Sequence, residues 1–403
     1  MTNGRLIHDN KGRFTSSAPR FALYAFILLA IEFFDEFIYG AREAAWPLIR
    51  DDLALSYAQV GLLLCAPNVI GNLVEPFLAI LGDVWRRRVI VLGGGVFFAA
   101  ALLLTALSRS YGLLLASFIL FYPASGAFVS LSQAKLMDLD PARREQNMAR
   151  WTAAGSLGVV AGPLALGGAA ALALGWRGLF VAFAGLTVVL LALTWRFPAD
   201  TGPANSQSPL PNLIAGLLGA LRALRRGEVL RWLVLLEFSD LMLDVLLGYL
   251  ALYMVDVGGA TPAQAGMAVA VWTGVGLLGD FLLIPLLERV KGLSYLRVSV
   301  VIELILYPAF LLAPPIWAKF VLLAVLGFFN SGWYAILQAG LYSAMPGQSG
   351  AALAVKNVSG LAGGLIPLAL GLIAERLGLQ AAMWLLLLGP VVLLIGLPRS
   401  DPS

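Results

Sequence analysis

The chain has 403 residues, of which 60% are hydrophobic and only 12% charged, and its formal net charge is +4. Soluble domains carry about 25% charged residues, so this composition excludes an ordinary soluble protein and makes the lipid bilayer the solvent for much of the chain. The small positive charge gives no basis for binding nucleic acid. The single cysteine, Cys65, excludes a disulfide framework or a cysteine-based metal site, and we expect no cofactor. The single histidine, His8, lies in the polar N-terminal tail, so proton chemistry within the membrane would use carboxylates.

Twelve apolar segments follow one another along the chain, each close to the roughly 20 residues that a membrane-crossing helix needs. The first six cover residues 21–41, 58–81, 89–107, 111–136, 148–174 and 178–194. The second six cover residues 232–255, 263–287, 296–312, 319–344, 351–374 and 380–397. Acidic residues inside the first segment distinguish it from the core of a signal peptide, so we expect it to be retained. The sequence thus predicts an all-α membrane protein with twelve transmembrane helices in two pseudo-symmetric six-helix bundles.

Polar segments divide the chain into five parts: a tail at 1–20, a bundle at 21–195, a central linker at 196–231, a second bundle at 232–397 and a tail at 398–403. Lysine and arginine are concentrated in alternate loops, which by the positive-inside rule places both termini in the cytoplasm. The outer loops receive Arg42, Arg50, Arg109, Arg177, Lys319 and Arg376. We therefore predict a multi-pass, monomeric protein of the plasma (inner) membrane.

The central linker contains a predicted amphipathic helix at 212–226. Leucines recur near one face, and Arg222, Arg225 and Arg226 gather at its end. That pattern is typical of a helix lying on the cytoplasmic membrane surface. The alternative is an extension of the next span.

The two sets of spans repeat one another at an offset of about 205 residues. The offset aligns polar residues inside apolar sequence: Glu32 with Glu237, Asp35 with Asp240, Glu75 with Asp280, and Gln133 with Gln338. Six spans is an even number, so the two halves are parallel copies related by an axis along the membrane normal. In that arrangement a substrate site forms near mid-membrane between halves that rock around it.

Carboxylates concentrate on the first and seventh predicted spans. The first span places Glu32, Asp35 or Glu36, and Tyr39 on one helical face, and the seventh holds Glu237, Asp240 and Asp244. A carboxylate at the bilayer centre costs about 2.5–3.5 kcal/mol, which favours a shared polar cavity that binds substrate or protons. Asp35 and Asp240 are the first choices, because both lie well inside their spans. The alternative is that some of these groups pair with Arg42 or another helix and only hold the halves together.

Four further polar residues lie in matching places of the two halves. Glu75 and Asp280 occupy the second and eighth spans, and Gln133 and Gln338 occupy the fourth and tenth. They are candidates for the same cavity, or for hydrogen bonds between helices. Glu303, in the ninth span, has no acidic counterpart in the first half, and the sequence assigns it no role.

Charged and small residues near the helix ends suggest gating elements. Asp83 stands close to Arg87 and Arg88 in the loop after the second span, where charge-assisted bonds to a neighbouring helix end would favour one conformation. The alternative is that the arginines only anchor the loop at the membrane surface. Gly162 and Pro163, in the glycine-rich fifth span, predict close helix packing and a bend. Lys135 and Lys356 lie near cytoplasmic helix ends, from which their side chains can reach water.

With these residues in place, nearly the whole chain resembles the major facilitator superfamily. Its loop signature after the second helix is Gly-x-x-x-Asp-Arg-x-Gly-Arg-Lys/Arg, of which Asp83, Arg87 and Arg88 are kept. Ala79, Val84 and Arg86 depart from that signature. The resemblance implies twelve helices, a cytoplasmic central loop and a gating role for the conserved positions.

The fifth span also resembles the antiporter pattern Gly-x-x-x-Gly-Pro-x-x-Gly-Gly. The run from Gly158 through Gly162 and Pro163 to Gly167 and Gly168 approaches it, with one residue too many before the glycine pair. Residues 47–62 are similar to drug-efflux members of the fosmidomycin-resistance type. These resemblances favour export by antiport.

The sequence hypothesis is a proton-coupled exporter of a small organic or drug-like compound that works by alternating access. Alternatives are an uptake symporter for a metabolite or metal cation, a lipid translocator, or a non-transporting membrane sensor. An enzyme is not expected, because the sequence offers neither a nucleophile–base pair nor a metal cluster. Substrate identity, direction and stoichiometry lie beyond the sequence.

Overall fold

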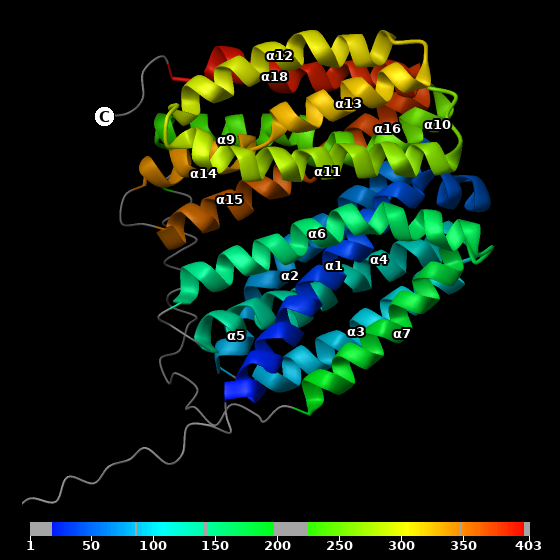
Figure 1. Ribbon diagram of the computed structural model, residues 1–403, viewed down its shortest axis with the longest axis vertical. Coiled ribbons are helices and arrows are strands. Elements are labelled where there is room, and N and C mark those ends of the chain that lie inside the picture. The colour runs from blue at the N-terminus through cyan, green and yellow to red at the C-terminus, as the bar shows by residue number, and fades with distance from the viewer. Residues whose placement is uncertain are drawn as a thin grey trace, which may run out of the picture.

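A computed structural model describes residues 18–84, 87–139, 143–196, 222, 224–345 and 349–398. Its helices form two groups, which Figure 1 shows one above the other. The N-terminal group consists of α1 (Ala18–Leu53), α2 (Tyr57–Val84), α3 (Arg87–Leu107), α4 (Tyr111–Ser125), η1 (Gly126–Ser130), α5 (Leu131–Leu139), α6 (Arg144–Ala171) and α7 (Gly175–Trp195).

The C-terminal group lies uppermost in Figure 1 and is coloured green to red. It consists of α9 (Gly227–Asp240), η3 (Leu241–Val245), α10 (Leu246–Asp256), α11 (Pro262–Leu287), α12 (Gly292–Leu312), α13 (Ile316–Asn330), α14 (Trp333–Ser343), α15 (Ser349–Gly363), α16 (Ile366–Leu377), α17 (Leu379–Trp384), η4 (Leu385–Leu387) and α18 (Leu388–Gly396). The amphipathic helix predicted at 212–226 falls largely outside the described residues.

Ten helical segments among the described residues are long and apolar enough to cross a membrane. The chain is therefore a multi-pass membrane protein. Two of the twelve predicted spans are not among these ten, and they correspond to α1 and to the run α9–η3–α10. Both carry carboxylates of the predicted site, which lower their mean hydropathy, and both bury many of their apolar residues within the protein.

The first predicted span was placed at 21–41, but α1 is one continuous helix of 36 residues that extends to Leu53. Arg42 and Arg50 therefore lie on this helix and not in an outer loop. The helix continues because Ala45, Trp46 and Ile49 form a buried apolar face beyond Arg42. Arg42 itself is only 5% exposed, which corrects its assignment to the outside.

The predicted fourth and tenth spans are both interrupted, at equivalent positions of the repeat. In the fourth span a π-helical turn, η1, begins at Gly126. In the tenth, α13 ends at Asn330 and α14 begins at Trp333, with Gly332 in the left-handed conformation at φ 73°. Irregular turns of this kind are frequent at functional sites, and their backbone groups need other partners. The repeat therefore extends to backbone geometry as well as to sequence.

Glycines bring α1 and α6 into direct backbone contact. A Cβ atom added at Gly162 would overlap backbone atoms of Phe37 and Ala41, and one at Gly40 would overlap the backbone of Val159. Small residues permit such close approach in membrane bundles. This packing holds the acidic helix α1 in place through its length.

Replacing Gly162 with alanine is therefore expected to destabilise the protein by about 1–3 kcal/mol, because overpacking against backbone cannot be relieved by a side-chain movement. Thermal unfolding of the purified protein in detergent measures the effect. Gly167→Ala is the matched control on the same helix, since nothing lies within 4 Å of the added atom. Equal stability of the two variants would contradict this account of the seam.

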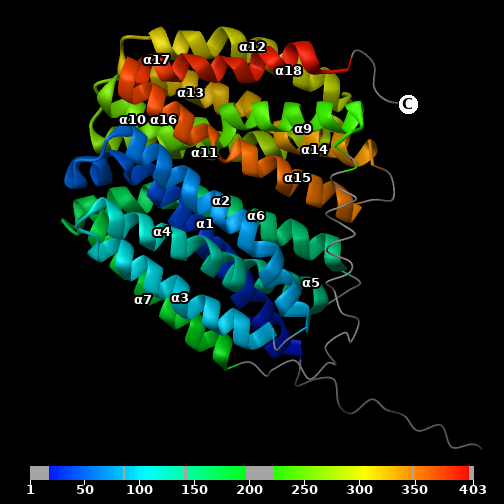
Figure 2. The same ribbon diagram turned by 180° about the vertical axis from the view of Figure 1, so that it is seen from behind.

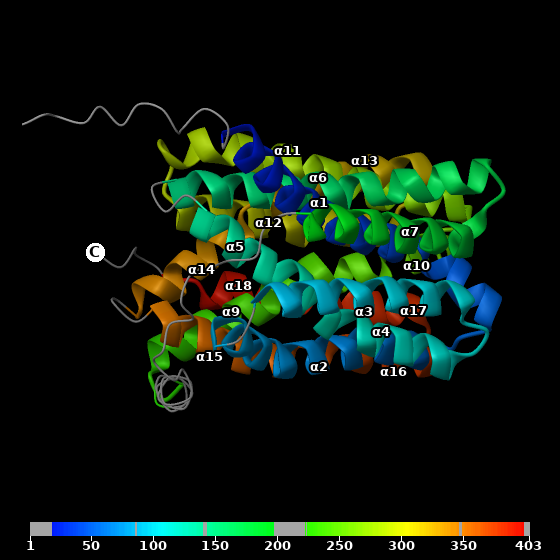
Figure 3. The same cartoon turned by 90° about the horizontal axis from the view of Figure 1, so that it is seen from below.

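The two groups meet along helices that face each other across the molecule. The helix α2 packs on α16, α6 packs on α11, and α1 contacts both α10 and α11. The view from behind shows α2 and α16 side by side, and the view from below places α6 beside α11 (Figures 2 and 3). The carboxyl-rich α1 thus lies at the junction of the two groups.

Candidate functional site

Two serines, one directly before η1 and one at its end, donate hydrogen bonds to two of the predicted acidic residues in the N-terminal group. The Ser125 hydroxyl donates to Asp35, at 3.0 Å from Oδ1 and 3.1 Å from Oδ2. The Ser130 hydroxyl donates to Glu75 Oε1 over 2.6 Å. Asp35 and Glu75 also interact electrostatically with each other. The π-helical turn therefore positions one carboxylate from α1 and one from α2 on the same side of α4.

The other two acidic residues of α1 face a different helix. A Cβ added at Gly155 of α6 would lie 2.8 Å from Glu32 Oε1 and 3.3 Å from Glu36 Cγ. Glu32 also contacts Trp151 of α6. The sequence placed Glu32 and Tyr39 on one face together with either Asp35 or Glu36, and the fold directs Asp35 to α4 and Glu32 and Glu36 to α6.

In the C-terminal group the acidic residues surround the π-helical turn η3. Asp240 ends α9, and Asp244 lies inside η3, where it is exposed to solvent. Glu237, one turn earlier, accepts a hydrogen bond of 2.7 Å from the Ser359 hydroxyl of α15. Glu237, Asp240 and Asp244 interact electrostatically along this turn.

Electrostatic interactions connect the acidic residues of the two groups across the junction. Asp244 interacts with Glu36, Tyr39 and Glu43 of α1. These residues come from helices that are equivalent in the repeat, α1 and α9–η3–α10, which pack against one another. The structure thus connects Asp244 with Glu36 and Glu43, whereas its counterpart in the repeat is Tyr39. A shared role for the aligned carboxylates, such as Asp35 and Asp240, stays a prediction.

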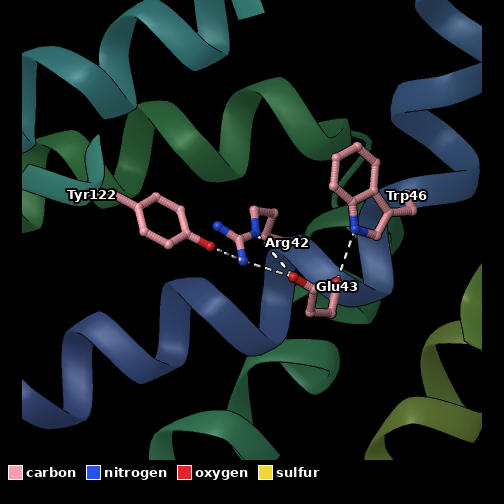
Figure 4. Close-up of polar contacts among 4 residues, drawn as sticks. All are labelled: Arg42, Glu43, Trp46 and Tyr122. Atoms are coloured by element: carbon pink, nitrogen blue, oxygen red, sulfur yellow. Dashed lines mark hydrogen bonds and ion pairs between the residues drawn. The ribbon is translucent and has the colours of Figure 1, made fainter. Parts of the chain in front are cut away.

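A buried ion pair lies at this junction, which the sequence had not identified (Figure 4). Arg42 donates to Glu43 Oε1 from Nε at 3.1 Å and from Nη2 at 2.7 Å. Trp46 Nε1 donates to Glu43 Oε2 at 2.9 Å, and Arg42 Nη2 donates to the Tyr122 hydroxyl at 3.3 Å. Arg42 and Glu43 are only 5% and 1% exposed.

The ion pair also lies next to Tyr39 of α1 and Gly248 of α10. The Arg42 guanidinium lies 5.0 Å from the centre of the Tyr39 ring, a cation–π arrangement. Glu43 Oε2 lies close to Gly248 of α10, where a Cβ would be 3.6 Å away. Glu43 has no acidic counterpart in the repeat, since glycine stands at 248, so the duplication gave no signal for it.

Lys356 of α15 is a second charged residue whose neighbours the sequence did not predict. It is half-buried, and its ammonium lies against the Tyr334 hydroxyl and 4.4 Å from the centre of that ring. It interacts electrostatically with Glu237, Asp240 and Asp244. Lys356 therefore supplies the positive charge beside the acidic residues of the C-terminal group.

The remaining predicted residues are placed as follows. Gln133 donates from Nε2 to the Met148 sulfur of α6 over 3.6 Å, and Gln338 is half-buried on α14. Asp280 is exposed on α11, and its Oδ1 accepts a hydrogen bond of 3.0 Å from the Gly332 amide at the helix break.

The predicted gating residues are only partly described. The Asp83 side chain lies outside the described residues. Arg87 forms an ion pair with Asp138 of α5 over 2.7 Å, and Arg88 donates to the carbonyl of Trp195 on α7. The arginines thus join helix ends within the N-terminal group. Gly162 lies in the α1–α6 seam, and Pro163 lies inside α6 without ending the helix.

A set of contacts joins the two groups at the end of the molecule where α1 ends and α2 begins. Arg50 pairs with Asp256 of α10 over 2.7 Å, and the Tyr57 hydroxyl donates to the same carboxylate over 2.7 Å. The Tyr57 amide donates to Glu375 of α16 over 2.9 Å. We call Arg50, Tyr57, Asp256 and Glu375 the end clamp.

Close helix packing continues directly beneath the end clamp. A Cβ added at Gly61 of α2 would lie 2.7 Å from the Pro367 carbonyl oxygen of α16. The Tyr249 hydroxyl donates to that same oxygen over 2.7 Å. Among the described residues, this end therefore joins α2, α10 and α16 without room for an intervening side chain.

Comparisons with known proteins agree with this architecture. The family model described as Major Facilitator Superfamily matches residues 25–366. The chain belongs to the Major Facilitator Superfamily, whose members are transporters of small molecules. No curated protein matches the chain in sequence.

Solved structures of two kinds share its fold. The first is a bacterial homologue of the human lysosomal transporter Spinster in an inward-facing, unoccupied conformation, with a TM-score of 0.72, 18% identity, and coverage of 95% of this chain and 96% of that chain. The same protein in its occupied inward-facing conformation matches with a TM-score of 0.72 and 16% identity over 94% and 95%. A mutant of the nucleoside transporter NupG matches with a TM-score of 0.75 and 13% identity over 93% and 98%.

Proposed function

We propose that this transporter exports a small organic cation in exchange for protons, by alternating access at the junction of its two groups. The observation that carries the proposal is the convergence of Glu36 and Asp244, from equivalent helices of the two halves, on one electrostatically connected site. Placing carboxylates within the bilayer costs free energy, which binding of a cation or proton offsets. A site shared by both halves is also the place where rocking motions change access.

The charge balance of the site favours a cation. Glu43 is neutralised by Arg42, and Lys356 offsets part of the charge around Asp240 and Asp244. Glu32 and Glu36 interact with further acidic groups, Arg42 being the cation that acts on Glu36. A protonated amine or a proton would complete this balance, so substrate and protons would compete for the same carboxylates.

The topology that we propose adds α1 and the run α9–η3–α10 to the ten apolar segments, which gives twelve spans in two six-helix bundles at 21–195 and 232–397. Both termini would then lie in the cytoplasm, in the plasma membrane, by the distribution of lysine and arginine. The end clamp would face the outside. The structure would then correspond to a transporter closed at its outer end.

Replacing both Asp35 and Asp240 with asparagine is expected to abolish substrate-driven proton movement, because the amide keeps the size of the side chain and cannot carry the exchanged proton. The measurement is the internal pH of proteoliposomes loaded with a panel of organic cations. Asp51→Asn, at an exposed acidic position of the same helix α1, is the matched control. Undiminished proton exchange in the double variant would show that these two carboxylates have no coupling role.

The direction of transport is tested separately, with cells that contain or lack the protein. Export predicts that the protein lowers accumulation of the cation and raises resistance to it. Accumulation that increases with the protein would instead support uptake.

A further inference from the structure

Glu303 lies in the middle of α12, inside the C-terminal group, and the proposed function makes no use of it. Its side chain is 0% exposed. Neither carboxyl oxygen has a hydrogen-bond partner among the described residues. Burying an ionised carboxylate without a partner lowers the stability of a protein by several kcal/mol. Glu303 at this position therefore needs a physical explanation.

No positive charge lies close enough to neutralise a Glu303 carboxylate in the described part of the chain. The helices that pack on α12 are α13, α14, α17 and α18, and the only lysine or arginine on them is Lys319. Lys319 donates over 2.7 Å to the carbonyl oxygen of Phe310, two turns after Glu303 on α12, and lies over the ring of Tyr253 of α10. Arg297, on α12 itself, donates to the carbonyl of Pro398.

The other titratable groups around Glu303 are tyrosines. Tyr307, one turn later on α12, donates to the Met383 carbonyl of α17 over 2.9 Å. Tyr334 and Tyr342 lie on α14, where both are exposed. None of these groups supplies a counter-charge, and burial without one favours the neutral carboxylic acid over the carboxylate.

One tyrosine of α12 interacts with both Glu303 and an acidic residue of α11. Tyr295, two turns earlier on α12, interacts electrostatically with both Glu303 and Asp280. Its hydroxyl donates to the Ser331 carbonyl oxygen over 3.2 Å, at the break between α13 and α14. The next amide, that of Gly332, donates to Asp280 over 3.0 Å. Tyr295 and Asp280 therefore bind the carbonyl oxygen and the N–H of the same peptide group, which joins Ser331 to Gly332.

The break also contains a buried hydrogen-bond acceptor that lacks a donor. Asn330 Oδ1 is buried and has no partner among the described residues, while its Nδ2 donates to the Met242 carbonyl of η3 over 3.2 Å. Interrupted helices in transporters serve as binding places for ions and protons, because their end groups are free to bind them. A protonated group entering the break would satisfy such an acceptor.

We propose that Glu303 is a second proton-binding site of this transporter, connected to Asp280 of α11 through Tyr295 and the α13–α14 break. In this step the Tyr295 hydroxyl turns from the Ser331 carbonyl oxygen, accepts the proton of the Glu303 carboxylic acid and releases its own proton to the Asp280 carboxylate. Glu303 is then ionised, Tyr295 is again neutral and Asp280 is protonated. The proposal rests on the proposed function in one respect, which is that protons drive transport.

Infrared spectroscopy of the purified protein tests the protonation of Glu303 without any substrate. The wild-type spectrum is expected to contain a carbonyl band of a protonated carboxylic acid that loses one component in Glu303→Gln. Glu288→Gln, at an exposed position directly after α11, is the control and should leave the band unchanged. In Tyr295→Phe the component should remain but shift more slowly in heavy water. A band unchanged by Glu303→Gln overturns the proposal.

A transport assay then distinguishes a proton-carrying role of Glu303 from a structural one. Glu303→Gln should reduce the number of protons moved per substrate in proteoliposomes, while Glu288→Gln should not. Glu303→Leu keeps the site apolar and is expected to fold, since an unpartnered polar group is replaced by a well-packed one. If Glu303→Leu is more stable and moves protons in the wild-type ratio, Glu303 has no transport role. If the wild type itself moves no protons, the proposed function fails, whereas the infrared result still decides the state of Glu303.

Discussion

Replacing Glu43 with alanine is expected to lower the free energy of unfolding by about 3–5 kcal/mol, the typical cost of breaking a buried ion pair by removing one partner. The variant would leave the Arg42 guanidinium buried with the Tyr122 hydroxyl as its remaining bonding partner in Figure 4. It would also leave Trp46 Nε1 without its acceptor. Thermal unfolding in detergent, together with the yield of folded protein, measures the loss.

A double variant distinguishes the energetic contribution of the pair from its functional one. Arg42→Met with Glu43→Leu removes both charges together, which is often neutral or stabilising for a buried pair. We expect this variant to fold and yet to transport poorly, because Glu43 interacts with Asp244 and Arg42 lies over Tyr39. Arg109→Ala, at an exposed position, is the control and should change stability by less than about 0.5 kcal/mol. Wild-type stability of Glu43→Ala would show that Arg42 finds other partners.

Breaking the end clamp is expected to expose Cys65, the only cysteine of the chain. Cys65 lies on α2 one turn after Gly61 and is 3% exposed. Arg50→Ala with Asp256→Ala removes the ion pair and an acceptor of Tyr57, which we expect to weaken the closed state by about 1–2 kcal/mol. That change corresponds to a 5–30-fold larger open population. The rate at which a membrane-impermeant maleimide labels Cys65 measures it, and it should rise by the same factor.

Two controls accompany the labelling experiment. Asp51→Ala removes an exposed carboxylate next to Arg50 that takes no part in the end clamp, so its labelling rate should match that of the wild type. A Cys65→Ala variant should not be labelled. If the clamp variant is labelled no faster than Asp51→Ala, then close packing at Gly61 and Pro367 keeps this end closed without the ion pair.

Two features of the sequence, the length of its apolar segments and the repeat between its halves, predicted parts of the fold. Apolar length identified the ten segments that are long and apolar enough to cross a membrane, and the duplication identified polar residues at equivalent positions of the two halves. The register that aligns Glu32 with Glu237 also aligns the two interrupted helices, at Gly126 and Ser331. The interruptions themselves were not predicted, because hydropathy does not report which hydrogen bonds a helix keeps.

The residues that sequence reasoning missed share one property, which is that their roles depend on a neighbour far along the chain. Arg42 resembles an outer-loop charge until α1 is seen to continue past it and bury it beside Tyr122, 80 residues away. Lys356 resembles a surface lysine until Tyr334 and the acidic residues of α9 are placed beside it. The serines that bind Asp35 and Glu237 carry no signal in the sequence, since serine is common in apolar helices.

The sequence by itself determined that this chain crosses the membrane many times, that its halves repeat, and that acidic residues lie on equivalent helices. These conclusions follow from the transfer of side chains into lipid, which depends on residue type and spacing alone. Tertiary structure alone decided which carboxylates meet, that Arg42 neutralises Glu43, and that Glu303 has neither partner nor counter-charge in the described part of the chain. Pairing and burial are properties of packed helices, and a charge buried in a bundle has the same sequence signature as one that reaches water.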